Sequence, residues 1–274
     1  MSDLFSLLWA PFLMCLVLTG LHAYLGLHVI AREVVFVDIA LAQIAALGAT
    51  AAFLLGFELD SWVSYFSGLG ATLAGALVLA LTRTRERRIS QEAVIGVVYA
   101  VSAAATVLLV AGAPHGTEHL RTMLVGNILT VSGSEVLKVG LLYAVIGALH
   151  WWWRGPLLLI STDAEAAFRA GRRVRLWDFL FYASFGLMVT TSVRIAGVLL
   201  VFSYLIVPAL AAMALGGSIR RQLGVGWSLG ALVSLVGITA SAAFDLPTGA
   251  TVVCVFGLAL LAVSAFMRGL MGRR

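Results

Sequence analysis

The sequence predicts an all-α protein, a polytopic transmembrane bundle of about nine helices. Hydrophobic residues make up 61% of the 274 residues and charged residues only 11%, whereas about a quarter of the residues in soluble globular proteins are charged. Apolar runs of about 20 residues, the length of a helix that crosses a bilayer, recur along the chain. Because no linker interrupts this pattern, we expect a single membrane domain over residues 1–274.

Nine apolar stretches are long enough to be spans. They cover residues 7–29, 35–57, 62–82, 93–112, 136–153, 176–192, 195–215, 223–244 and 248–267. A count of eight is the alternative, and it would reverse the orientation of the N-terminus. A further apolar piece, residues 123–131, is too short to cross alone. It suits a re-entrant or interfacial element buried against other helices.

The net charge of +5 reflects basic residues in short loops, as expected for arginines and lysines kept on the cytoplasmic side of a membrane. This distribution does not favour nucleic-acid binding. If residues 83–88 are cytoplasmic, alternation of the spans places residues 154–175 and the C-terminal tail on the same side. The N-terminus is then outside. Cys15 and Cys254 lie in apolar runs without paired spacing, so neither a disulfide framework nor a thiolate metal site is indicated.

The longest charged interruption of the chain is residues 161–174, STDAEAAFRAGRRV. Its charge alone is typical of a solvated cytoplasmic loop, and the alternative is a surface that contacts a partner. Its alanines favour a short helix, and Gly171 suits the C-terminal stop of that helix.

Few ionisable side chains lie inside the spans, and each is a candidate functional residue because a charge in hydrocarbon is costly. Asp38 lies near the start of the second span, where it can either cap the helix or line a pathway. Gln43 follows five residues later, about 140° around the helix from Asp38.

Other polar residues lie outside the long spans. His115 and His119, with Glu118, occupy one outward-facing loop, and this ligand type suits zinc or manganese; ordinary loop histidines are the alternative. Asn127, in the short apolar piece, is expected to bond free backbone groups. The chain has no GxxxxGK[ST] loop, HExxH or GxSxG motif, so we expect a subunit without catalytic residues, cofactor or nucleotide site of its own.

Several segments, in order along the chain, resemble the integral membrane subunit of bacterial zinc/manganese/iron ABC importers. They are EAVIG at 92–96, MLVGNILTV at 123–131, DAEAAFRAG at 163–171, VRIAGVLLV at 193–201 followed by LIVPA at 205–209, and DLPTG at 245–249.

This resemblance implies a type II ABC importer-like permease in the bacterial inner membrane, importing divalent metal ions, with zinc or manganese as the expected cargo. A second copy of the chain would complete the pathway, separate cytoplasmic ATPase subunits would bind ATP, and an extracytoplasmic metal-binding protein would deliver the ion. The ATPases would contact a coupling segment at about 160–175. Its expected coupling residues are Asp163, Glu165, Ala167, Ala170 and Gly171.

The second span departs from the family pattern GD-x-x-x-H. Aligned on Gly48, the family histidine falls on Gln43 and its aspartate on Ile39, with Asp38 one position earlier. The candidate metal or pathway residues are therefore Asp38, Gln43, His115, His119 and Asn127. Two alternative functions remain: an ABC permease for a metal chelate on the same scaffold, and a secondary transporter that needs no ATPase.

Overall fold

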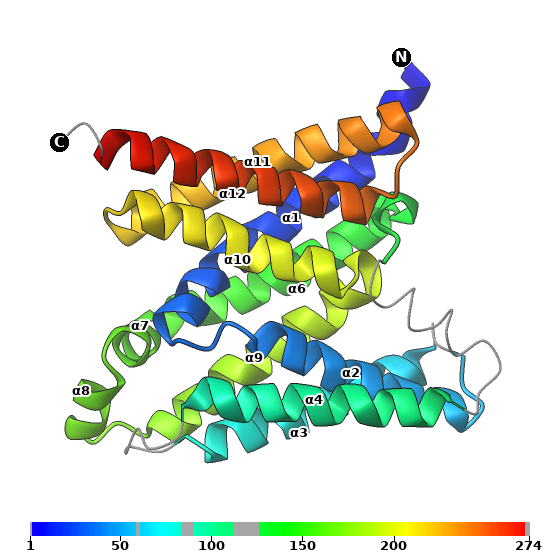
Figure 1. Cartoon of the computed structure of the whole chain (residues 1–274). Coiled ribbons are helices and arrows are strands. Elements are labelled where there is room, and N and C mark those ends of the chain that lie inside the picture. Colours follow the sequence, from blue (N-terminus) through cyan, green and yellow to red (C-terminus); the bar gives the residue numbers. More distant parts are fainter. Residues whose placement is uncertain (1, 59–60, 84–89, 112–125, 272–274) are drawn as a thin grey trace. The chain divides into compact units, whose positions relative to one another are not determined.

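The computed structural model describes residues 2–58, 61–83, 90–111 and 126–271, and every regular element in those ranges is a helix (Figure 1). Within the described ranges, nine helices are long and apolar enough to cross a membrane. The predicted all-α fold with about nine spans is therefore confirmed. The elements are α1 (Ser2–Ala31), α2 (Val37–Leu54), α3 (Trp62–Leu81), α4 (Gln91–Val110), η1 (Ile128–Thr130), α6 (Gly133–Trp152), α7 (Arg154–Thr162), α8 (Ala164–Arg169), α9 (Val174–Ala196), α10 (Val198–Leu215), α11 (Ile219–Phe244) and α12 (Thr248–Met271).

The chain forms two compact units. Unit 1 comprises residues 1–30, 124–145 and 195–274, and unit 2 comprises residues 31–123 and 146–194. The expectation of one membrane domain over residues 1–274 concerns how these two units assemble, and it stays a prediction.

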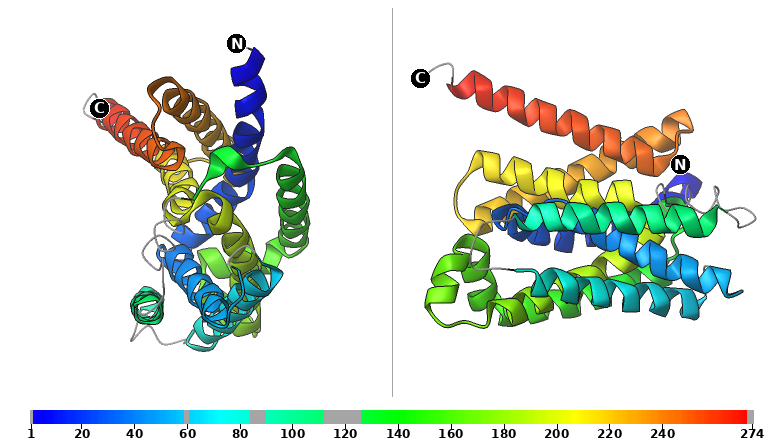
Figure 2. Two further views of the ribbon diagram at one scale, coloured as in Figure 1. Left: turned by 90° about the vertical axis from the view of Figure 1, so that its right-hand side faces the viewer. Right: turned by 60° about the horizontal axis from the view of Figure 1, so that its bottom comes forward.

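In unit 2, α2 packs against both α3 and α4 (Figure 2). Glycines let α2 and α3 approach closely. A Cβ atom on Gly48 would lie 2.6 Å from the carbonyl oxygen of Ser67, and one on Gly68 would lie 2.8 Å from that of Ala45. The Ser67 hydroxyl also donates a hydrogen bond of 2.6 Å to the Gly48 carbonyl. Close packing and such bonds hold helices together in lipid, where the hydrophobic effect does not.

In unit 1, the helices α10, α11 and α12 pack against one another. Tyr204 of α10 joins all three. Its hydroxyl lies 2.6 Å from the Ser234 hydroxyl of α11, and its ring meets the ring of Phe256 in α12 edge-on, with 4.9 Å between centroids. The buried phenol therefore has both an apolar contact and a hydrogen-bond partner, as a buried tyrosine requires.

Serine caps set the starts of several spans. The side chains of Ser61, Ser90 and Ser218 each accept a hydrogen bond from a backbone N–H in the first turn of α3, α4 and α11. Such bonds satisfy donors that the helix itself leaves free. These three helices begin within four residues of the starts predicted from the apolar stretches.

The break between α9 and α10 lies later than the sequence suggested. Residues 193–194 were expected to separate the two spans, but α9 continues to Ala196 and the chain breaks at Gly197, whose φ is 76°. Glycine adopts this left-handed conformation without a Cβ clash. The backbone N–H of Asn127 donates to the carbonyl of Ile195 at 3.1 Å and so satisfies one terminal acceptor of α9.

Candidate functional site

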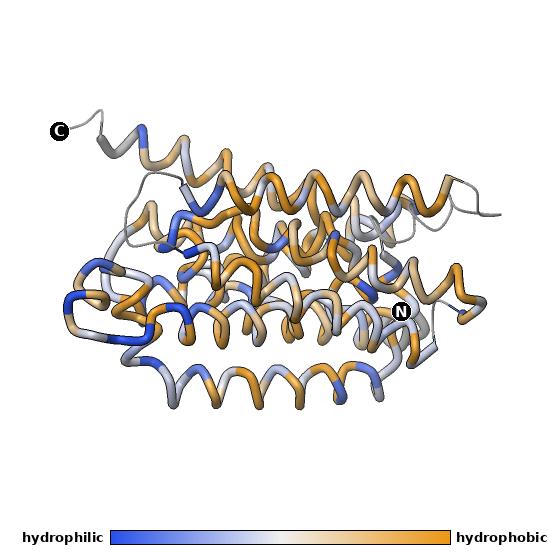
Figure 3. The backbone as a smooth tube through the Cα atoms, turned by 90° about the horizontal axis from the view of Figure 1, so that it is seen from below, coloured by the Kyte–Doolittle hydropathy of each residue, from blue (hydrophilic) through white to orange (hydrophobic). Residues whose placement is uncertain are grey.

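The coupling segment, at about 160–175, contains the end of α7 and the whole of α8. Asp163 separates these two helices and caps the second: its Oδ1 accepts a hydrogen bond of 2.8 Å from the backbone N–H of Ala166. In Figure 3, the spans are mostly hydrophobic, whereas this segment, on the left as in Figure 1, contains hydrophilic stretches. The local fold thus sets a short polar helix between two apolar spans.

Gly171 ends α8, as predicted. Its φ is 67°, its N–H donates to the carbonyl of Phe168, and the N–H of Arg172 donates to that of Ala167, both at 3.1 Å. These two bonds form a Schellman motif, the common C-terminal stop that requires a left-handed residue. Both ends of α8 are therefore fixed by residues that the sequence places there.

The five expected coupling residues lie on two different faces of the segment. Ala167 is fully buried and packs in an apolar cluster with Ile160 and Val174. The other four are exposed to the surroundings of the chain: Asp163, Glu165, Ala170 and Gly171. A partner can reach these four, whereas Ala167 fixes the helix to the protein beneath it.

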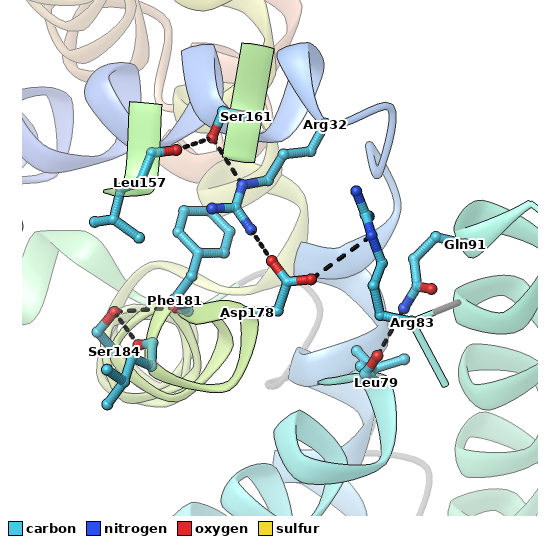
Figure 4. Close-up of polar contacts among 10 residues, drawn as sticks. Arg32, Leu79, Arg83, Gln91, Leu157, Ser161, Asp178, Phe181 and Ser184 are labelled. Atoms are coloured by element: carbon cyan, nitrogen blue, oxygen red, sulfur yellow. Dashed lines mark hydrogen bonds and ion pairs between the residues drawn. The ribbon is translucent and has the colours of Figure 1, made fainter. Parts of the chain in front are cut away.

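A buried polar network lies directly beside this segment in unit 2 (Figure 4). Arg32, just after α1, donates from Nε to the Ser161 hydroxyl of α7 at 2.8 Å and from Nη1 to the Asp178 carboxylate of α9 at 2.6 Å. Its guanidinium lies over the Phe181 ring, 3.9 Å from the ring centroid. Arg83, after α3, reaches the other oxygen of Asp178 at 3.6 Å. These residues are called the Arg32 network.

Burial lowers the pKa of the Arg32 guanidinium from its ordinary value, and the Asp178 carboxylate opposes this change. Arginine nevertheless stays protonated in proteins. The positive charge of Arg32 is therefore fully buried, as is its partner Asp178. A buried charge is tolerated when it is paired and hydrogen-bonded. Arg32 and Asp178 are paired and share one hydrogen bond, whereas Nη2 of Arg32 and Oδ2 of Asp178 have no hydrogen-bond partner among the described residues.

Sequence reasoning missed this network, although it contained one signal. Asp178 is a carboxylate within an otherwise apolar span. An ionisable residue in a span is a candidate functional residue, so Asp178 could have been singled out for the same reason as Asp38. Its partners Arg32 and Arg83 are 146 and 95 residues away along the chain. The pairing of Arg32 with Asp178 therefore depends on the tertiary fold.

Asp38 lies in the first turn of α2 and is buried. Neither carboxylate oxygen has a hydrogen-bond partner among the residues that the structure describes. The expected alternative of a hydrogen-bonded cap is wrong: Phe36 occupies the N-cap position, and its N–H donates instead to the Glu92 carboxylate of α4 at 3.1 Å. Asp38 thus remains a buried carboxylate at the positive end of a helix dipole.

The remaining candidates are dispersed. Gln43 is half-buried on α2, and Asn127 is exposed beside η1, with its backbone rather than its side chain bonded to Ile195. His115 and His119 lie outside the described residues. Within the described part of the chain, no three His, Cys, Asp or Glu side chains are close enough together to hold a metal ion.

The chain is similar to proteins of bacterial metal transport systems. The manganese import system permease protein ScaB of Streptococcus parasanguinis is 27% identical over 231 residues, which cover 83% of this chain and 79% of the relative. The chelated iron transport system membrane protein YfeC of Yersinia pestis is 27% identical over 242 residues, which cover 87% and 79%.

The fold is also that of a solved structure, PsaBC from Streptococcus pneumoniae in complex with Fab. The TM-score is 0.77 at 21% identity, and the match covers 96% of this chain and 94% of that one. Together with the nine apolar helices, these similarities identify a multi-pass protein of the bacterial membrane. Because the sequence pattern of the ABC 3 transport family matches residues 5–267, nearly the whole chain, the protein belongs to that family.

Proposed function

We propose that this chain is the membrane-spanning permease subunit of an ABC importer for divalent metal ions, with manganese or zinc as cargo. The family match over residues 5–267 carries the proposal. The names of the relatives, among them a manganese import permease, support a metal cargo. The ions pass through the bundle, and ATP is bound by separate subunits.

The ATPase subunits dock on the exposed face of the coupling segment, formed by Asp163, Glu165, Ala170 and Gly171. The rigid ends of α8 support this role, because a capped helix of fixed length can transmit a push that a flexible loop would absorb. Ala167 and its apolar cluster hold the opposite face. A second copy of the chain and an extracytoplasmic metal-binding protein complete the transporter.

Asp38 is the proposed polar residue of the metal pathway in α2, with Gln43 as a weaker neutral ligand. The buried, hydrogen-bond-free carboxylate supports this assignment within the described residues, since an unpaired carboxylate in a membrane helix is costly unless it serves a function. Asn127, His115 and His119 are retained as candidates for contact with the ion outside α2.

A metal chelate is the second candidate cargo, favoured by one observation. Gln43 stands where the resembling family has histidine, and a neutral amide binds a bare transition-metal ion less strongly than imidazole does. The chelated iron system that includes YfeC is also among the relatives. Uptake of free Mn²⁺ and Zn²⁺ is to be compared with uptake of a ferric chelate: saturable uptake of the chelate alone would favour this second candidate.

Ala170→Trp tests the docking surface. Ala170 is exposed with an ordinary φ of −75°, so the bulky ring blocks a partner without straining the backbone. Gly171→Trp is less informative, because any side chain there is forced into a left-handed conformation. We expect Ala170→Trp to abolish copurification of the ATPase and metal uptake while membrane insertion stays normal.

Leu246→Trp is the matched control. Leu246 is also exposed, but it lies between α11 and α12, on the side that the alternation of spans places outside. We expect wild-type uptake and copurification for this variant. Wild-type uptake by Ala170→Trp would contradict docking on α8.

A further inference from the structure

The Arg32 guanidinium binds two elements at once. It donates to Ser161 in the last turn of α7 and to Asp178 in α9, and Figure 4 shows it between these two partners. Ser161 immediately precedes the turn that holds Asp163, the cap of α8. Arg32 therefore connects the base of the coupling segment with the start of a membrane helix.

Asp178 extends this connection to a third element. Its second oxygen lies 3.6 Å from Nε of Arg83, the residue that follows the end of α3. The Arg175 side chain of α9 also donates to the Arg83 carbonyl at 3.3 Å. The Asp178 carboxylate of α9 thus contacts Arg83 after α3 and Arg32 between α1 and α2, and Arg32 in turn reaches the end of α7.

Stability alone explains this arrangement poorly. Removing charges from water is costly, and apolar residues of similar volume often stabilise a protein as well as a buried ion pair does. The apolar cluster of Ile160, Ala167 and Val174 already holds α8 against the chain. The ionic contacts add a defined geometry, because a planar guanidinium fixes the relative positions of two acceptors in a way that a lysine cannot.

We infer that Arg32 is a positioning residue, which transmits the movement of the coupling segment through Ser161 to Asp178 and so to the membrane helices. This inference rests on the proposed docking of an ATPase on α8. When α8 is pushed, the bonded guanidinium carries α9 and the end of α3 with it. Without the Ser161 bond, part of the push is lost in the turn between α7 and α8.

Ser161→Ala isolates this step. It removes the acceptor for Arg32 Nε and leaves the pair of Arg32 with Asp178 and the docking surface unchanged. The measurement is the number of Mn²⁺ ions transported per ATP hydrolysed in proteoliposomes that contain the full chain and its copurifying ATPase and are supplied with the extracytoplasmic metal-binding protein. We expect normal copurification and continued ATP hydrolysis, with the transport ratio lowered by about fivefold or more, the lower end of typical coupling between sites.

Thr162→Val is the matched control. Thr162 is the next residue, is exposed, and bonds only to carbonyls of its own helix, Leu158 and Leu159. Its loss should leave the transport ratio unchanged. A structural role for hydroxyls in α7 would instead lower the thermal stability of both variants and leave both ratios unchanged.

Arg32→Lys is the second variant, in case Ser161→Ala does not fold. The ammonium keeps the charge opposite Asp178 but cannot hold both acceptors in the same geometry, so its transport ratio should fall as well. An unchanged ratio in whichever variant assembles would overturn the inference, and so would failure of both variants to fold, which would assign the network to stability. If the wild-type chain captures no ATPase, the proposed function fails instead.

Discussion

Asp38 combines a negative charge with complete burial at the first turn of α2. The dipole of α2 favours a carboxylate there, but it is the Glu92 carboxylate that accepts the hydrogen bond from the Phe36 N–H at the start of this helix. The carboxylate of Asp38 therefore has no structural task visible among the described residues. The proposed pathway role would account for a carboxylate at this position.

Asp38→Asn is predicted to lower metal uptake by at least about tenfold, the lower end of the cost of removing even an indirect metal partner. The amide has nearly the same shape, so assembly with the ATPase and thermal stability should be unchanged. The measurement is initial uptake of Mn²⁺ and Zn²⁺ by cells that express the variant.

Asp245→Asn serves as its control. Asp245 is an exposed carboxylate in a left-handed conformation after α11, which asparagine also tolerates. Its uptake should match the wild type. Equal uptake by Asp38→Asn and the wild type would remove Asp38 from the pathway.

The helix α8 of the coupling segment has only six residues. Isolated helices of this length are unstable in water, so its persistence depends on the Asp163 cap, the Gly171 stop and the apolar cluster around Ala167. A docking helix needs this support, since it must keep its shape while a partner moves it.

We predict that Asp163→Ala destabilises α8 by about 1 kcal/mol, the usual cost of losing a helix cap. Asp163→Asn keeps a capping oxygen and should retain α8. Hydrogen exchange of the amides in residues 164–171 should accelerate in the alanine variant only, and metal uptake should fall with it. If asparagine impairs uptake as much as alanine while exchange stays slow, the negative charge itself contacts the partner, and capping is not the main role.

The helices and the C-terminal stop of α8 could be predicted because their causes are local. Apolar runs of membrane length, the serines before α3, α4 and α11, and Gly171 all act on neighbouring residues. The expected break at residues 193–194 was displaced to Gly197 because a positive φ, invisible as a charge pattern, ends α9.

The contents of the site were less predictable, because they depend on distant residues. Burial of Ala167 results from packing against Ile160 and Val174. The cap contributed by Glu92 joins residues that are 56 positions apart, and the pair of Arg32 with Asp178 joins residues that are 146 apart. A single sequence contains the residue types for such contacts but not their pairing.

Coupling to the ATPase and passage of the ion are two tasks that we assign to residues of one compact unit. The coupling segment and the Arg32 network belong to unit 2, and Asp38 of the proposed pathway belongs to the same unit. The helix α8, where the ATPase is proposed to act, and Asp38 of α2 thus belong to one compact body. This arrangement suits a subunit that converts ATP hydrolysis in a partner into access for an ion.

The most direct test is metal uptake, with and without ATP, by proteoliposomes that contain the chain with its copurifying ATPase and are supplied with the extracytoplasmic metal-binding protein. We expect accumulation of Mn²⁺ or Zn²⁺ that requires ATP on the side of the coupling segment and is abolished by Ala170→Trp. Accumulation that proceeds equally without ATP, or that Ala170→Trp leaves intact, would contradict the proposed function.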